Sequence, residues 1–157
     1  GNPGTGKTHL AVAAMKVLMG RGFNGLFYDY QTLLEHIQRG WDQASGSEER
    51  RAYQNVLDAE VLLLDDLGAR RALEWAEDAI AAIITHRYNH RKPLIATSNL
   101  SDPAAGHEVM SGQTPGGFAR PGKTISEVIG ERARSRLFEM CRVVKMPTVE
   151  DYRLRRR

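Results

Sequence analysis

The sequence contains a single cysteine and no hydrophobic run that approaches the length needed to cross a membrane. Because Cys141 is alone, no disulfide can form within the chain, and its apolar neighbours indicate a buried thiol in a reducing compartment. No signal peptide is visible among the printed residues. These absences argue against a disulfide-stabilised secreted domain, and they predict a cytoplasmic protein without a membrane partner.

Net charge is also small, at +3, although the basic residues are unevenly placed. The hydrophobic fraction of 41% and the charged fraction of 26% are typical of one soluble globular domain, which we expect to span residues 1–157. The clustered arginines are Arg132, Arg134, Arg136, Arg142, Arg153, Arg155, Arg156 and Arg157. Two interpretations remain open: an electrostatic surface for nucleic acid or nucleotide, or a solvated helix face followed by a frayed tail.

The chain opens with a phosphate-binding loop, since its first eight residues match the pattern G-x-x-x-x-G-K-[ST]. The candidate nucleotide-binding residues are Gly1, Asn2, Pro3, Gly4, Thr5, Gly6, Lys7 and Thr8. The glycines allow the backbone N–H groups to point inward around phosphate oxygens. Lys7 supplies a positive charge for the β- and γ-phosphates, and the hydroxyl of Thr8 is a candidate ligand of Mg²⁺.

A loop of this kind normally follows a buried strand, yet here it begins at residue 1 and no initiating Met precedes it. The sequence therefore predicts an N-terminally truncated domain whose first strand is missing.

Apolar runs alternate with helical patterns along the rest of the chain. Strands are predicted at residues 25–30, 61–66, 93–99 and 142–146, and helices at 7–19, 33–40, 47–59, 73–88 and 125–140. A Gly- and Pro-rich stretch at 101–122 indicates a flexible insertion. This alternation predicts an α/β fold, a three-layer sandwich with a parallel sheet.

Polar residues stand where two of the predicted strands end, and parallel strands bring such residues to one edge of the sheet. Asp65 and Asp66 follow the apolar run 61–64, and Asn99 ends the next strand. We expect Asp65 to hold Mg²⁺ and Asp66 to orient or deprotonate an attacking water. The amide of Asn99 suits either the γ-phosphate or that water.

A basic residue and an aromatic residue, Arg39 and Trp41, lie close together near the end of a predicted helix. Such a pair can stack on and neutralise a single nucleic-acid strand. The alternative is that the tryptophan packs against its own domain, and the sequence leaves both interpretations open.

Taken together, five motifs resemble those of the AAA+ helicase-loader ATPases of the DnaC/DnaI type and of the related IstB transposition helpers. Residues 1–11 resemble the Walker A motif, 63–69 Walker B, 95–100 sensor 1, 130–137 the arginine-finger box and 151–153 sensor 2. The resemblance implies that Arg136 acts as an arginine finger on a neighbouring subunit. It also implies that Arg153 contacts the γ-phosphate within its own subunit.

The resemblance implies an ATPase that uses ATP and Mg²⁺, self-associates with ATP at subunit interfaces and binds single-stranded DNA. It further implies that the domain assists loading of the replicative helicase, which would bind through a region absent here. The pair Asp65-Asp66 replaces the Asp-Glu of many AAA+ proteins and favours slow, assembly-dependent hydrolysis. Two alternatives remain: an IstB-like transposition helper, and a nucleotide-dependent binding module with little or no hydrolysis.

Overall fold

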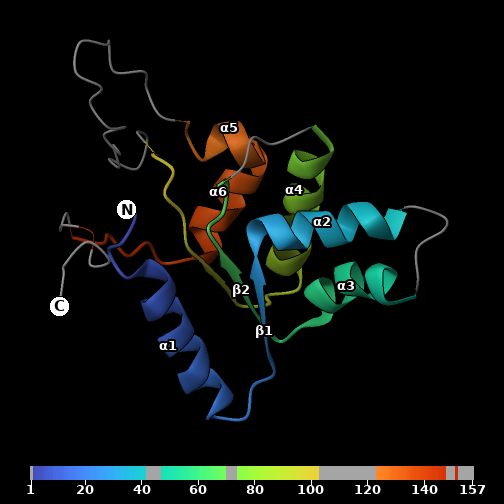
Figure 1. Cartoon of the computed structure of the whole chain (residues 1–157), viewed down its shortest axis with the longest axis horizontal. Helices are drawn as coiled ribbons and strands as arrows, with labels where there is room; N and C mark the ends of the chain where they lie inside the picture. Colours follow the sequence, from blue (N-terminus) through green and yellow to red (C-terminus); the bar gives the residue numbers. More distant parts are fainter. Residues whose placement is uncertain (1, 42–46, 70–73, 103–122, 148–150, 152–157) are drawn as a thin grey trace.

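The computed structural model describes residues 2–41, 47–69, 74–102, 123–147 and 151, with the backbone alone at 41 and 47–50. Its elements follow the order α1 (Lys7–Met19), β1 (Gly25–Asp29), α2 (Tyr30–Trp41), α3 (Ser47–Asp58), β2 (Val61–Asp65), α4 (Glu74–Asn89), β3 (Leu94–Ala96), α5 (Ser126–Ile129) and α6 (Glu131–Met140). Figure 1 shows these elements along the chain. The alternation of strands and helices confirms the predicted α/β class.

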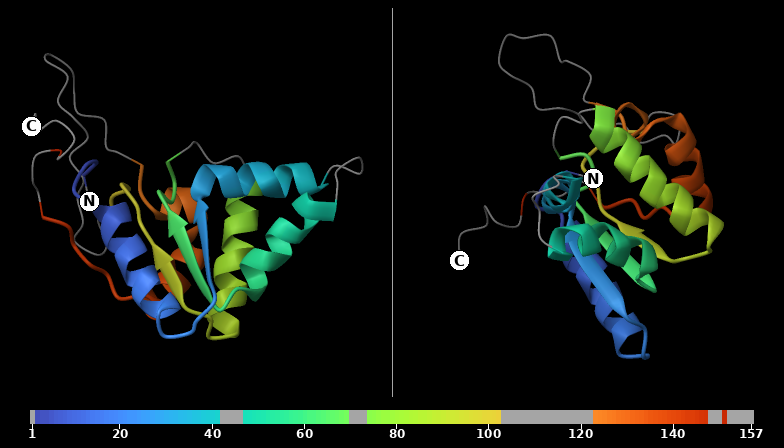
Figure 2. Two further views of the ribbon diagram at one scale, coloured as in Figure 1. Left: turned by 60° about the horizontal axis from the view of Figure 1, so that its bottom comes forward. Right: turned by 90° about the vertical axis from the view of Figure 1, so that its right-hand side faces the viewer.

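The three strands form a parallel sheet in the order β1-β2-β3, with Leu64 of the central strand opposite Tyr28 on one side and Ala96 on the other. Helix α1 covers one face of this sheet, and the other described helices lie on the opposite face (Figure 2). The described part of the chain is therefore a three-layer α/β/α arrangement, as the sequence predicts.

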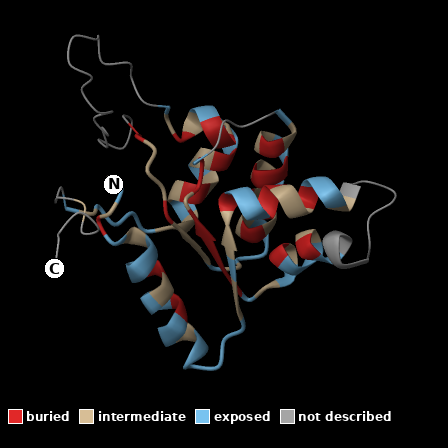
Figure 3. Ribbon diagram, in the orientation of Figure 1, coloured by how far each residue is buried: buried red, intermediate tan, exposed pale blue. Residues whose placement is uncertain are grey.

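Strand β2 is the centre of the core, and all five of its residues are buried (Figure 3). Leu62 and Leu64 face the large cluster formed with α2 to α6, while Val61 and Leu63 pack against Ala11 and other residues of α1. Alternate strand residues point to opposite faces, so a strand covered on both faces needs a continuous apolar run. This run delivers Asp65 to the carboxyl edge of the sheet.

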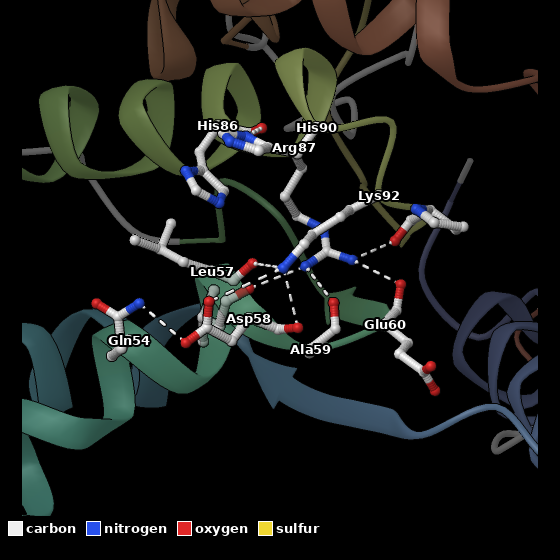
Figure 4. Close-up of polar contacts among 11 residues, drawn as sticks. Gln54, Leu57, Asp58, Ala59, Glu60, His86, Arg87, His90 and Lys92 are labelled. Atoms are coloured by element: carbon white, nitrogen blue, oxygen red, sulfur yellow. Dashed lines mark hydrogen bonds and ion pairs between the residues drawn. The ribbon is translucent and has the colours of Figure 1, made fainter.

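A buried cation joins the opposite end of the sheet to the helices. The side chain of Arg87 on α4 is fully buried and donates hydrogen bonds only to main-chain oxygens among its described contacts. The acceptors are the carbonyls of Val56, Ala59, Glu60 and Pro93, at 2.9, 3.1, 3.2 and 2.6 Å (Figure 4). Burial lowers the pKa of Arg87 to about 10, so the guanidinium still carries its charge at neutral pH.

Those acceptors lie where helix α3 ends and where β2 and β3 begin. The last carbonyls of a helix have no partner within the helix, and a cation there also compensates the negative end of the helix dipole. Lys92 reinforces the same point by donating to the carbonyls of Leu57 and Asp58 at 2.7 and 3.0 Å (Figure 4).

Three of the predicted elements differ from those of the structure. The helix predicted at 125–140 is broken at Gly130, whose φ of 76° and ψ of 153° are not helical, so that α5 and α6 are separate. The short strand predicted at 142–146 is absent, because this described segment pairs with none of the described strands. Strand β3 also ends at Ala96, three residues before the predicted end.

The predicted insertion at 101–122 begins with two buried residues. Ser101 forms an isolated parallel bridge with Thr124, and the carboxylate of Asp102 forms a bidentate ion pair with Arg134 at 2.8 Å. The rest of the insertion, residues 103–122, lies outside the described residues. None of the helices that the structure describes combines the length and apolar character that a bilayer crossing needs.

Candidate nucleotide-binding site

The phosphate-binding loop is a tight turn closed by its own side chains. Gly4 and Gly6 have φ values of 73° and 86°, which residues with a Cβ rarely adopt, and α1 begins directly after them. Thr5 Oγ1 and Lys7 Nζ both donate to the carbonyl of Asn2, at 2.9 and 2.7 Å. The turn thus brings the charge of Lys7 close to the N-terminus of α1, as an anion site requires. Gly1 lies outside the described residues.

The C-terminal part of the chain returns to this loop. The carboxylate of Asp151 lies directly against Gly4, at the position that a side chain on residue 4 would occupy. An acidic group in this place is consistent with a loop whose backbone attracts anions. Asp151 belongs to the predicted sensor 2 motif, whose Arg153 lies outside the described residues.

Replacement of Gly4 by alanine tests whether the turn binds a ligand. Gly4→Ala introduces a Cβ at positive φ and places it against the carboxylate of Asp151, so we expect nucleotide affinity to fall at least about tenfold. Gly22→Ala is the matched control, because its φ is 93° and open space surrounds it. Calorimetric titration with ATP is the measurement. Equal affinities for the two variants would contradict the assignment of the loop.

The loop is tied to the sheet through the buried carboxylate of Asp65. Thr8 Oγ1 donates to Asp65 Oδ2 at 2.9 Å, and Thr97 Oγ1 at the end of β3 donates to Asp65 Oδ1 at 2.6 Å. The two residues expected to hold Mg²⁺, Thr8 and Asp65, are therefore in direct contact although they are 57 positions apart. Hydroxyl and carboxylate oxygens are the ligands that Mg²⁺ prefers.

The next two polar residues also meet. Asn99 Nδ2 donates to Asp66 Oδ1 at 2.7 Å, and Asn99 Oδ1 is a buried acceptor without a hydrogen-bond partner among the described atoms. The backbone of Asp66 has a φ of 56°, which is uncommon for a non-glycine residue and is often found at functional sites. Asp66 and Asn99 together offer a carboxylate oxygen and an amide oxygen to one small hydrogen-bond donor, such as a water.

These groups fit ATP and Mg²⁺. The loop residues and Lys7 would hold the phosphates, and Thr8 and Asp65 would hold the metal, while the unsatisfied oxygen of Asn99 is suited to a donor on the attacking side. Bound Mg²⁺ would supply charge neutralisation at the phosphate oxygens.

Arg136 lies on α6, away from these groups. It lines a separate, open depression of about 520 Å³ between α4 and α6, together with the stacked rings of His86 and His90. Its guanidinium lies 5.9 Å from the centre of the Tyr88 ring. No residue of the phosphate loop lines this depression in the described part of the chain, so the structure does not bring Arg136 to its own loop.

The arginines of α6 lie in two environments. Arg134 is paired with Asp102 and contacts the Phe138 ring, whereas Arg132 is exposed and lines the same depression as Arg136. The candidate DNA contacts are less informative. Arg39 is exposed in the last turn of α2, and the side chain of Trp41 lies outside the described part.

A groove of about 600 Å³ runs along the free edge of β3, from Lys7 and the inner face of α1 to the segment 141–147. Val143 and Val144 border it and are 47% and 66% exposed. Cys141 also lines the groove, and its thiol lies 3.4 Å from the carbonyl of Leu94. Burial raises the pKa of this thiol, although Cys141 is only partly buried where the sequence predicts a buried cysteine.

Sequence reasoning missed Thr97, which contacts both acidic residues of the site. Its hydroxyl donates to Asp65 and accepts a hydrogen bond from the backbone N–H of Asp66 at 2.9 Å. The available signal was its place two residues before Asn99, at the end of an apolar run. A threonine at the end of a strand is also common in ordinary loops, so the pattern alone does not identify it.

The relatives of this chain among known proteins include a helicase loader and an insertion-sequence protein. The chain is 29% identical over 150 residues to the uncharacterized protein YqaM of Bacillus subtilis, which covers 90% of this chain and 39% of that protein. It is 25% identical to the replicative helicase loader DnaC of Escherichia coli, covering 65% and 42%. It is 29% identical to the putative ATP-binding protein of insertion sequence IS5376 of Geobacillus stearothermophilus, covering 64% and 39%. The chain thus spans less than half the length of each of these relatives.

Solved structures agree with the fold. A DnaC helicase loader is 32% identical with a TM-score of 0.67, over 88% of this chain and 71% of that chain. DnaI is 22% identical with a TM-score of 0.65, over 96% and 69%, and shows the fold alone. The fold is therefore that of the P-loop AAA+ helicase loaders. The family model of the IstB-like ATP binding proteins matches residues 1–110, and the chain belongs to this family.

Proposed function

We propose that this chain is the ATP-binding and ATP-hydrolysing AAA+ domain of a DNA helicase loader, which binds single-stranded DNA and assists loading of the replicative helicase. The hydrogen bond between Thr8 and Asp65 carries the ATPase proposal, because it joins the phosphate loop to the acidic end of β2. The likeness to the DnaC loader structure, at 32% identity, supports the role in loading.

The described contacts support the following roles. The loop and Lys7 would bind and orient the phosphates, and Thr8 and Asp65 would hold Mg²⁺. Asp66 and Asn99 would orient the attacking water, and Asp66 would accept its proton. Aspartate is shorter than the glutamate found here in many AAA+ proteins, which supports slow hydrolysis.

Arg136 completes the site from a second copy of the chain. It lines an open depression away from its own loop, and a guanidinium placed on the phosphates of a neighbouring subunit would stabilise the charge of the transferred group. ATP would then lie at subunit interfaces, and assembly would control turnover. Arg153, two residues after Asp151, acts in this proposal on the γ-phosphate of its own subunit.

A role as an IstB-like transposition helper is the second candidate, favoured by the family match over residues 1–110 and by the insertion-sequence relative. DNA preference separates the two roles. We expect single-stranded DNA to stimulate turnover more than double-stranded DNA in a loader, through a surface that includes Arg39 and Trp41. The opposite preference would favour the transposition helper.

We also propose that the groove beside β3 receives a further parallel strand. Neighbouring residues of a strand point their N–H and C=O groups to opposite sides, so β3 presents half of these groups to the groove. The exposed valines of 142–146 would gain a neighbour on the far side of such a strand.

The protein would act in the cytoplasm, where replication proteins and ATP are found.

The variant Lys7→Ala tests the ATPase proposal. We expect it to lose nucleotide binding by about a hundredfold, because it removes the charge that faces the β- and γ-phosphates. Lys16→Ala, an exposed lysine of the same helix, is the matched control. Binding of a fluorescent ATP analogue and release of phosphate are measured on both variants and on the wild type.

Three outcomes are informative. Lys16→Ala at wild-type level with Lys7→Ala inactive supports the ATPase. Mg²⁺-dependent binding without phosphate release in the wild type would favour the binding module that hardly hydrolyses ATP. Unchanged nucleotide binding by Lys7→Ala would contradict the proposed site.

A further inference from the structure

We propose that Thr97 is a positioning residue that sets the orientation of both acidic side chains of the site and so determines how well Mg²⁺ is held. This role rests on the proposed ATPase function. Thr97 does not touch the nucleotide in this proposal, since it acts through Asp65 and Asp66.

The direction of each hydrogen bond follows from the chemistry of the hydroxyl group. The backbone N–H of Asp66 donates to Thr97 Oγ1 at 2.9 Å, so this oxygen serves there as an acceptor. Its single proton is then donated to Asp65 Oδ1 at 2.6 Å. Thr97 is buried, and its hydroxyl makes one hydrogen bond as acceptor and one as donor.

This hydrogen bond occupies only one oxygen of the carboxylate and leaves the other directed toward Thr8. Asp65 Oδ1 is occupied by Thr97, while Oδ2 points to Thr8 at 2.9 Å, where the second metal-holding oxygen is. A carboxylate fixed in this way keeps one oxygen directed at the cation, so its side chain does not need to rotate before the metal binds. Outer-shell hydrogen bonds orient metal ligands in other proteins by the same principle.

The second bond acts on the backbone of Asp66. Its φ of 56° is stabilised only if surrounding contacts hold it, and the hydrogen bond from its N–H to Thr97 is one such contact. The neighbouring hydrogen bond from Leu67 N to the carbonyl of Thr97, at 2.8 Å, is a main-chain contact that any residue at 97 retains. Substitution of the side chain therefore removes the hydroxyl contacts and leaves the strand pairing in place.

The adjacent hydroxyl has a different environment and provides a control. Ser98 Oγ donates to the carbonyl of Leu67 at 2.8 Å and accepts the N–H of Leu100 at 3.1 Å, with no described hydrogen bond to either acid. Loss of a hydroxyl from the same turn can thus be compared with loss of the hydroxyl that contacts the acids.

The test uses the full chain with Thr97→Val, Thr97→Ala, Thr97→Ser and Ser98→Ala. Binding of a fluorescent ATP analogue is titrated with and without Mg²⁺, and phosphate release is measured against Mg²⁺ concentration. For Thr97→Val and Thr97→Ala we expect metal-free binding to stay near wild type, with the Mg²⁺ concentration for half-maximal effect raised about 10–100-fold. Thr97→Ser should restore most of the Mg²⁺ response, and Ser98→Ala should resemble the wild type.

The outcomes separate this inference from the proposed function. A wild type that binds no nucleotide overturns both. A wild type with Mg²⁺-dependent binding, combined with a normal Mg²⁺ response in Thr97→Val or Thr97→Ala, overturns the role of Thr97 alone. Thermal melting of each variant identifies any that is unfolded. The alanine and valine variants differ in volume, so a packing defect would affect the two to different extents. Loss of metal-free binding equal to the loss with Mg²⁺ would indicate general damage and would also contradict the proposal.

Discussion

Arg136→Ala should reduce ATP turnover about a thousandfold or more while nucleotide affinity stays within about threefold of the wild type. The expected loss is large because an arginine finger neutralises charge that develops only as the phosphoryl group is transferred, and so it adds little to binding. Phosphate release at saturating ATP and equilibrium binding are measured on the same preparations. Arg21→Ala, an exposed arginine beyond the far end of α1, is the control for loss of one positive charge.

Mixing the variants gives a sharper form of this experiment. Lys7→Ala has a damaged loop and an intact Arg136, whereas Arg136→Ala has the reverse. If the arginine acts on a neighbouring subunit, a mixture of the two inactive proteins should recover part of the wild-type turnover. Turnover of Arg136→Ala at the wild-type rate would contradict the finger assignment, and the assembly-controlled mechanism would then have no support.

Arg87→Met should destabilise the domain by about 3–5 kcal/mol, which is among the largest effects expected of a single substitution. Methionine fills much of the same space but leaves the carbonyls of Val56, Ala59, Glu60 and Pro93 buried without these donors. Urea denaturation followed by circular dichroism measures the free energy of unfolding.

Lys92→Met is the matched control, because Lys92 also donates to main-chain oxygens of α3 but its side chain is 25% exposed. Water can replace its hydrogen bonds, so we expect a loss of about 1 kcal/mol. Equal losses of unfolding free energy in the two variants would show that the contribution of the Arg87 hydrogen bonds to stability does not depend on their burial. Nucleotide affinity of folded Arg87→Met should stay unchanged.

The parts of the fold that the sequence predicts well are those in which local pattern and burial agree. Residues 61–64 are all apolar because both faces of β2 are covered, and the end of this run identifies the position of Asp65. Helix α1 begins and ends at the predicted residues, since glycines flank a regular apolar pattern.

The errors occur where distant residues decide the local conformation. Gly130 interrupts a helical pattern, and the carboxylate of Glu77 on α4 lies 3.0 Å from the place where a Cβ would stand, which no local pattern reveals. The segment 142–146 contains two β-branched valines that favour a strand, but strand formation needs a partner edge. The role of Thr97 depends on the register between β2 and β3, which pairs Leu64 with Ala96 and so places Thr97 beside Asp65.

The contacts of Arg87 also have a consequence for how this domain can change during evolution. Every amino acid supplies a main-chain carbonyl, so the four residues that accept hydrogen bonds from Arg87 can be exchanged without loss of the acceptors, provided that the chain keeps its path. The arginine has no such freedom, because no other side chain reaches four acceptors with a planar set of donors. Among relatives we therefore expect an invariant arginine surrounded by partners of drifting identity, a pattern in which pairwise covariation would not detect the contact.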